Sequence, residues 1–269
     1  MNDFHKVNLE EEKETLLITL LAKALDSRSK NTILNDRKAE EILKMIDYDF
    51  EKLNNFGNDV IVIRAKQFDT WLKDFIEGND NVTVLNLGCV LDTRVSRLNP
   101  QSKVLWFDVD YPDVIDVRKL FFSTKDGYEM ISSSVTELDW LEHIPNDRPV
   151  MIIAEGLLEY LTEVEVKTLL DRMTTFFTHG QIAFDVMNSF AIKSGKERLK
   201  ETTGAIHKWI VDDVHDVDKL NTKLTKAADL SVFKSTYIHN LPLKVRLMYA
   251  TLCLIPSFRN MMRLLLYKF

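Results

Sequence analysis

Five short apolar runs, all after residue 80, constrain the fold of this chain more than any other feature. In chain order they read VTVLNLG, KVLWFDVD, YEMISS, VMIIAEG and QIAFDVMN. Runs without a polar face are typical of strands that helices cover on both sides of a parallel sheet. Segments long enough for helices separate several of the runs. The pattern therefore predicts an α/β fold with a doubly wound, mostly parallel sheet.

The part of the chain before these runs is predicted to be helical. Residues 16–25 are apolar on almost every side, which indicates a buried helix, and residues 36–45 are a second helix candidate. From Arg64 onward, apolar residues recur at helical spacing and form one stripe. We expect residues 1–80 to form a helical cap that contributes to the ligand pocket, and residues 81–269 to form the core of one integrated domain.

Composition excludes several classes of protein. A formal net charge of −6 over 269 residues argues against a nucleic-acid partner. With only Cys89 and Cys253, the chain has no disulfide framework, which fits a reducing compartment. The acidic stretch MNDFHKVNLEEEKE at the start does not resemble a signal peptide, and no apolar stretch is long enough to span a bilayer. The chain is therefore expected to be cytoplasmic, without a transmembrane segment.

The end of the chain has two interpretations. After Asp229 the sequence has lysines and arginines but no acidic residue. Such a segment either supplies the last core elements with solvated charged flanks, which is the commoner case, or lies on a membrane surface.

Residues suited to ligand binding stand where the predicted strands end, which is where ligands bind in doubly wound sheets. Gly88 follows the first strand and lets a ligand approach the backbone. Asp108 and Asp110 follow the second, and an acid there accepts the hydroxyl protons of a ribose. Ser134 follows the third strand and would face an adenine edge. These residue types are also common in ordinary turns. Glu155, after the fourth strand, is different because an unpaired carboxylate at a buried strand end costs several kcal/mol.

Two cations stand among apolar residues. Lys23 is the only charged residue between Glu14 and Asp26, and Arg64 lies one turn before the apolar stripe of its helix. Both side chains either extend to water or point inward. If they point inward, they form a positive pocket that suits a carboxylate.

The loop after the first strand distinguishes between cofactors. A dinucleotide site needs G-x-G-x-x-G, whereas this loop has Gly88 alone, and the chain has no phosphate-binding G-x-x-x-x-G-K-[ST] motif. A nucleoside that carries an amino-acid carboxylate instead of phosphates fits better. The sequence therefore favours S-adenosylmethionine over a nicotinamide dinucleotide, and a dehydrogenase is the weaker alternative.

Three motifs, VLNLGCVLDTR, FDVDYP and IIAEGLLEYL, resemble the leucine carboxyl methyltransferase superfamily. Segments such as TLLITLLAKALDSR, RAKQFDTWL and TTGAIHKWIVDD are similar to its bacterial branch of tetracenomycin-type polyketide O-methyltransferases, so the resemblance covers nearly the whole chain. It implies the class I S-adenosylmethionine-dependent methyltransferase fold, which is Rossmann-like. Its sheet has seven strands, the last antiparallel, with helices on both faces and an N-terminal helical cap.

The resemblance also implies how the residues above would hold the cofactor. The methionine carboxylate would pair with Lys23 and Arg64, and the cofactor would pass the backbone of Gly88. The other implied contacts are Asp110 with Asp108 beside it for the ribose hydroxyls, Ser134 and Val135 for the adenine, and Glu155 near the methionine part. This chain departs from the family at three places: Val90 stands where a second glycine is usual, Ser134 and Val135 replace an aspartate and a leucine, and Glu159 replaces an apolar residue.

The predicted reaction is transfer of a methyl group from a sulfonium to an oxygen of a small, polyketide-like molecule. None of the six histidines stands at a predicted strand end, which favours a carboxyl acceptor that needs no base over a hydroxyl acceptor. Tyr160, Asp185 and Trp209 are the candidates for the substrate side. The acidic run DDVHDVD has no recognised ligand spacing, so no metal is predicted. Two alternatives remain: a protein C-terminal carboxyl methyltransferase, and a non-catalytic protein that binds S-adenosylmethionine.

Overall fold

A computed structural model describes residues 15–50, 57–137, 139–194 and 206–269. Seven strands form one sheet in the order β3-β2-β1-β4-β5-β7-β6. Neighbours from β3 to β5 are parallel, and β7 runs antiparallel to both β5 and β6. This confirms the predicted sheet with its last strand antiparallel. The strands are β1 Val82–Leu87, β2 Val104–Asp110, β3 Tyr128–Ser132, β4 Val150–Ala154, β5 Gly180–Met187, β6 Thr225–Ser231 and β7 Met262–Lys268.

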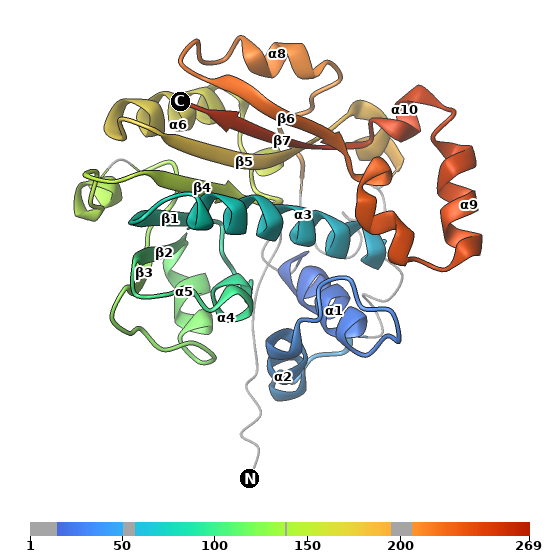
Figure 1. Cartoon of the computed structure of the whole chain (residues 1–269), viewed down its shortest axis with the longest axis horizontal. Helices are drawn as coiled ribbons and strands as arrows, with labels where there is room; N and C mark the ends of the chain where they lie inside the picture. Colours follow the sequence, from blue (N-terminus) through green and yellow to red (C-terminus); the bar gives the residue numbers. More distant parts are fainter. Residues whose placement is uncertain (1–14, 51–56, 138, 195–205) are drawn as a thin grey trace.

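Helices surround this sheet (Figure 1). Asp36 begins α2 because its carboxylate accepts a hydrogen bond from the Ala39 amide at 2.9 Å. At the start of α6, Thr162 and Glu165 form a capping box. The helices used below are α1 Thr15–Ser27, α2 Arg37–Met45, α3 Asn58–Glu77, α4 Arg94–Leu98, α5 Pro112–Arg118, α6 Glu163–Phe176, α8 Val214–Asp218, α9 Leu243–Leu252 and α10 Pro256–Arg259.

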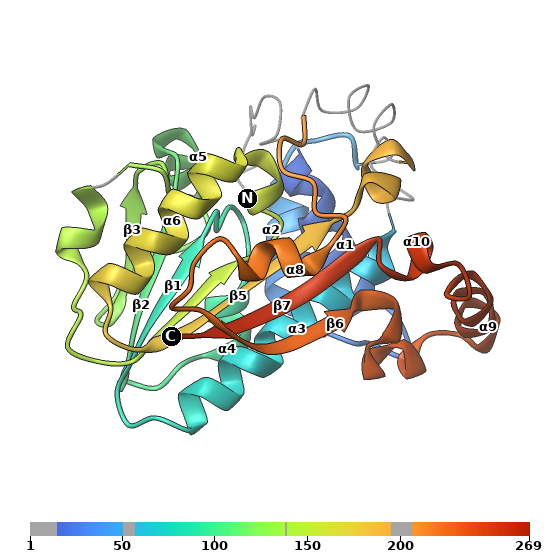
Figure 2. The same ribbon diagram turned by 90° about the horizontal axis from the view of Figure 1, so that it is seen from above.

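Two hydrophobic clusters cover the two faces of the sheet. Val84 and Trp106 point toward α1, α2 and α3, whereas their strand neighbours Leu85 and Phe107 point toward α6 and α8. Figure 2 shows α3 on one side of the strands and α6 with α8 on the other. Successive residues alternate between faces and both faces are buried, which explains why the strands read as continuous apolar runs.

The described part of the N-terminal region packs on this framework. In Figure 1, α1 and α2 lie beside α3, and apolar residues of all three helices belong to the cluster on that face of the sheet. Leu17, Leu20 and Ala24 of α1 are almost fully buried, as the apolar pattern of this helix predicts. The acidic N-terminal stretch lies outside the described residues.

The basic C-terminal part forms α9, α10 and β7. Leu264 and Leu265 of β7 are fully buried, so the segment contributes to the core. Within the described ranges, no helix is both long enough and apolar enough to cross a membrane.

Candidate functional site

Two cavities adjoin at the carboxyl ends of the parallel strands. The first has a volume of about 250 Å³ and is lined by Lys23, Arg64 and Glu155 among others. The second has a volume of about 110 Å³ and is lined by Asp110, Ser134 and other residues that follow β2 and β3. The residues that line both cavities are Gly88, Val90, Gly156 and Tyr160.

The smaller cavity brings together residues that the sequence predicts for the nucleoside half of the site. Asp110 lines it and holds the end of β1 in place, because its carboxylate accepts the amide N–H groups of Val90 at 2.9 Å and Tyr111 at 2.8 Å. Burial raises the pKa of Asp110 to about 6. Ser134 and Val135 line the same cavity.

The backbone between the two cavities passes through two glycines in the left-handed region. Gly88 has a φ of 62° and Gly156 a φ of 63°. A Cβ on Gly88 would lie 2.9 Å from the Leu157 side chain, and one on Gly156 would lie 3.0 Å from the guanidinium of Arg64. Both positions therefore need glycine for conformation and for space.

Arg64 of α3 points inward, one of the two directions that the sequence left open, and is 5% exposed. Its Nε donates to Glu155 at 3.2 Å and its Nη1 to Asp185 at 2.8 Å, which leaves Nη2 outside both pairs. Burial disfavours the charge of Arg64, but Asp185 and Glu155 outweigh this effect and raise its pKa above the usual value. Asp185 also accepts the Gly156 amide at 2.8 Å. Asp185 lines neither cavity, and its carboxylate positions Arg64.

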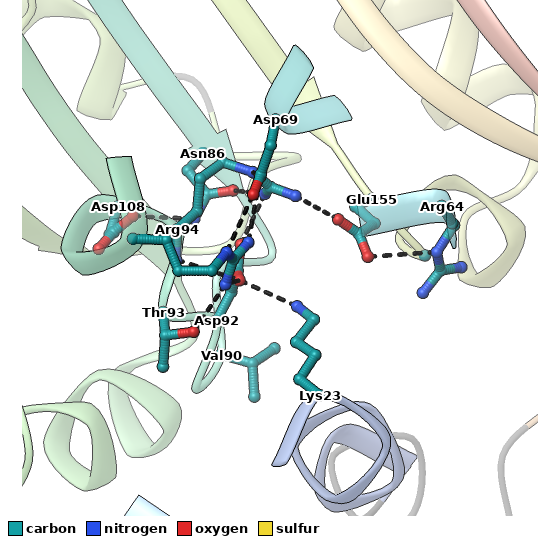
Figure 3. Close-up of polar contacts among 12 residues, drawn as sticks. Lys23, Arg64, Asp69, Asn86, Val90, Asp92, Thr93, Arg94, Asp108 and Glu155 are labelled. Atoms are coloured by element: carbon teal, nitrogen blue, oxygen red, sulfur yellow. Dashed lines mark hydrogen bonds and ion pairs between the residues drawn. The ribbon is translucent and has the colours of Figure 1, made fainter. Parts of the chain in front are cut away.

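Lys23 of α1 also points inward, and its ammonium donates to Asp92 at 2.9 Å (Figure 3). Glu155 bridges Arg64 and Arg94 in the same view. Burial would raise the pKa of Glu155, but the charges of Lys23, Arg94 and Arg64 lower it to about 2. The first cavity thus presents two cations and an ionised carboxylate, a set that suits the carboxylate and ammonium of an amino acid.

The charges that follow Gly88 connect the N-terminal helices to the end of β1. Arg94 donates to Asp92 at 2.6 Å, to Asp69 of α3 at 2.7 Å, and to Glu155. Arg97 donates to Asp69 at 2.9 Å and to the α2 cap Asp36 at 2.6 Å. Asp36 and Asp69 were missed by sequence reasoning. The one sequence signal for them is the closely spaced charges of the LDTR motif, because buried arginines need acidic partners elsewhere in the chain.

Asp108 does not belong to the ligand site. It is fully buried and accepts hydrogen bonds from Arg118 at 2.5 Å, Tyr128 at 2.6 Å, Asn86 at 2.9 Å and Trp106 at 2.9 Å. It lines neither cavity, so its carboxylate serves these four side chains and does not face the cavity that Asp110 lines. Its role is to hold Arg118, whose Nη1 donates to the carbonyl oxygens of the loop after Gly88.

Trp209, a candidate for the substrate side, also lies outside both cavities. It is 5% exposed, packs in the cluster on the α6 face and lines neither cavity. Its backbone N–H donates to the carbonyl oxygen of Glu159 at 3.2 Å, which supports the wall of the first cavity from behind. Tyr160 lines both cavities, and its ring centroid lies 5.3 Å from that of His207.

Val90 occupies a backbone conformation that suits glycine. Its φ is 45°, which is rare for a β-branched residue. The Asp110 carboxylate accepts its N–H and Arg118 donates to its carbonyl oxygen at 2.8 Å, so hydrogen bonds on both sides maintain this conformation. Val90 lines both cavities, where its side chain occupies space that a glycine would leave open.

No group of three or more metal-ligating side chains is found in the described ranges. The acidic run is a short helix, α8, whose first turn is capped by Asp213.

Comparison with known proteins identifies the family. The model of the leucine carboxyl methyltransferase family matches residues 15–174. The chain belongs to this family. Tetracenomycin polyketide synthesis O-methyltransferase TcmP of Streptomyces glaucescens is 35% identical over 259 residues, which cover 95% of this chain and 96% of that protein. The S-adenosyl-L-methionine-dependent methyltransferase dpfgK of Gibberella zeae is 32% identical over 240 residues, which cover 80% of each chain.

Solved structures support the same fold at much lower identity. A DUF574 family protein from Streptomyces avermitilis superposes with a TM-score of 0.56 at 10% identity, over 94% of this chain and 96% of its own. The plantazolicin methyltransferase BpumL superposes with a TM-score of 0.50 at 10% identity, over 95% of this chain and 98% of its own. The predicted family, class I fold and enzyme class are thus confirmed: the protein is a methyltransferase that uses S-adenosylmethionine.

The residues on the cavity walls fit this cofactor. Two glycine backbones separate a cavity with an acid suited to a ribose from a cavity with cations suited to an amino-acid carboxylate. Bound there, S-adenosylmethionine supplies an activated methyl group.

Proposed function

We propose that this protein is an O-methyltransferase that acts on a small aromatic, polyketide-like molecule in the cytoplasm. The observation that carries the proposal is the junction of the two cavities at Gly88 and Gly156, with Asp110 on one side and Arg64 on the other. The relative TcmP, an O-methyltransferase of polyketide synthesis that aligns over almost the full chain, supports this acceptor class. The free cysteines Cys89 and Cys253 support the location.

In this proposal each wall residue has one task. Lys23 and Arg64 hold the methionine carboxylate, and Glu155 borders the methionine part. Asp110 accepts the ribose hydroxyl protons, with Ser134 and Val135 at the adenine. Residues 1–80 act as a cap that supplies both cations, within one domain. The modest volume of the first cavity supports a small acceptor over the tail of another protein.

The cofactor half of the proposal is tested by replacing Asp110 with asparagine. The amide cannot accept both ribose hydroxyls as a carboxylate does, and a hydrogen bond to a charged group is worth about 1.5–3 kcal/mol. We therefore expect Asp110→Asn to weaken S-adenosylmethionine binding by roughly 10- to 100-fold in titration calorimetry.

The pH dependence of binding provides a second readout. Burial raises the Asp110 pKa to about 6, so the carboxylate is lost as the pH falls through this value. Wild-type binding should weaken below that pH, whereas binding to Asp110→Asn should not. Asp116→Asn, an exposed change on α5, is the control and should bind as the wild type does. Equal affinities for all three proteins would contradict the assignment of Asp110.

A further inference from the structure

Glu159 is a buried carboxyl group on the wall of the first cavity. It lies in the short 3-10 helix Leu158–Tyr160 that follows β4, and it is 5% exposed. Its Oε2 is buried and has no hydrogen-bond partner within the described ranges. Its backbone is fixed, because its carbonyl oxygen accepts the amide N–H groups of Lys208 at 2.7 Å and Trp209 at 3.2 Å. A carboxyl oxygen that is buried without a hydrogen-bond partner is costly to ionise, so Glu159 holds its proton tightly.

The charged groups around Glu159 oppose its ionisation. Burial has the largest effect, Asp185 of β5 and Glu155 at the end of β4 add repulsion, and Arg64 of α3 attracts. Together they raise the pKa of Glu159 to about 8. His207 also lines the cavity, and burial lowers its pKa, so it is a neutral neighbour near physiological pH.

The lining of this cavity also includes apolar and aromatic side chains. Ile18 of α1, Ile61 of α3 and Met187 at the end of β5 line the cavity with Ala191. The Tyr160 and His207 rings pair with an interplanar angle of 31°. These surfaces suit a flat aromatic ring, which packs against other rings and thioethers.

We propose that Glu159 is a catalytic residue that accepts the proton of a phenolic hydroxyl group on the acceptor. This inference rests on the proposed function and specifies its acceptor. The phenol proton moves to the carboxylate of ionised Glu159 as the phenol oxygen forms the new C–O bond. The sulfonium C–S bond breaks with its electron pair left on sulfur, and the proton on Glu159 then passes to water.

The charges on this wall favour a hydroxyl acceptor over a carboxylate. A carboxylate acceptor beside Glu159 would lie near Glu155 and Asp185, whose charges already resist the ionisation of Glu159. A neutral phenol adds no charge before reaction. A base with a pKa near the working pH is also well matched to a phenol. The sequence favoured a carboxyl acceptor because no histidine stood at a strand end, and Glu159 supplies a base of a different kind.

The test compares wild type with Glu159→Gln, and uses β-naphthol and β-naphthoate as matched probes. S-adenosylhomocysteine affinity is measured first by calorimetry and should be equal in the two proteins. Binding of each probe to the loaded protein is then measured between about pH 6.5 and about pH 8.5, on either side of the Glu159 pKa. β-Naphthol should bind wild type about tenfold more tightly at the higher pH, because only ionised Glu159 accepts its proton. β-Naphthoate should show the opposite trend, and Glu159→Gln should show neither.

Methyl transfer to β-naphthol gives the second readout. Glu159→Gln should lower kcat by about 100-fold or more, the usual worth of a general base. The exposed change Glu163→Gln should leave all these values as in wild type. Three results would overturn the inference and keep the proposed function, provided that both proteins bind S-adenosylhomocysteine. They are that wild type does not bind β-naphthol, that the two proteins show the same pH dependence of binding, or that they methylate β-naphthol at the same rate. If wild type does not bind S-adenosylhomocysteine, both proposals fail.

Discussion

Arg94→Met should lower the free energy of unfolding by about 3–5 kcal/mol, the usual cost of removing one partner from a buried ion pair. The Arg94 side chain is fully buried and pairs with the carboxylates of Asp69, Asp92 and Glu155. Methionine fills much of the space but has no charge, so the three carboxylates keep only their other partners. Chemical denaturation of the two proteins measures the difference.

Arg148→Met is the matched control for this experiment. Arg148 pairs with Asp147 at 2.8 Å at the surface, where such pairs are worth about 0–1 kcal/mol. The control should therefore unfold almost as the wild type does. Equal losses in the two variants would mean that the buried charges at the end of β1 do not stabilise the fold beyond an ordinary surface pair.

Arg94→Met should also reduce the affinity for S-adenosylmethionine. Arg94 supports Glu155 and Asp92, which in turn hold Arg64 and Lys23 at the first cavity. Glu155 and Asp92 thus position the pocket cations, and Arg94, which lines neither cavity, positions these two carboxylates. This explains why a dense group of charges follows Gly88 at the end of a buried strand.

The candidate site could be predicted from the sequence because glycines and charges at strand ends are local features. Gly88, Asp110 and Glu155 stand at the carboxyl ends of three parallel strands, and all three line a cavity there. The residues alone left open whether Lys23 and Arg64 extend to water or point inward, because charges among apolar residues allow both. Packing of α1 and α3 against the sheet selects the inward one.

Asp108 and Asp185 line neither cavity for the same reason, which is where their strands end. β2 continues to Asp110, so Asp108 lies inside the strand opposite Asn86 of β1. β5 continues to Met187, so Asp185 also lies inside its strand and reaches Arg64 instead of the substrate side. Hydrogen-bond pairing with neighbouring strands sets these ends, and a single sequence does not contain that information.

Glu159→Gln should remove a pH-dependent loss of stability from the wild type. The pKa of Glu159 is raised from 4.5 to about 8 in the folded protein. The folded state therefore holds this proton more tightly than the unfolded state does. Below the unfolded pKa both states are protonated and the group has no pH-dependent effect. As the pH rises from there through about 8, the unfolded state ionises first and wild-type stability falls.

The size of this effect follows from the shift, since each pKa unit is worth about 1.4 kcal/mol. The stability of Glu159→Gln minus that of wild type should thus grow by about 4–5 kcal/mol between acidic and mildly alkaline pH. Taking the difference cancels the titration of the other groups. Denaturation curves across this range measure it, and the exposed change Glu163→Gln should give a difference that stays constant. A constant difference for Glu159→Gln as well would show that its carboxyl is hydrated or ion-paired in the folded protein, because only a desolvated, unpaired carboxyl keeps its proton so strongly.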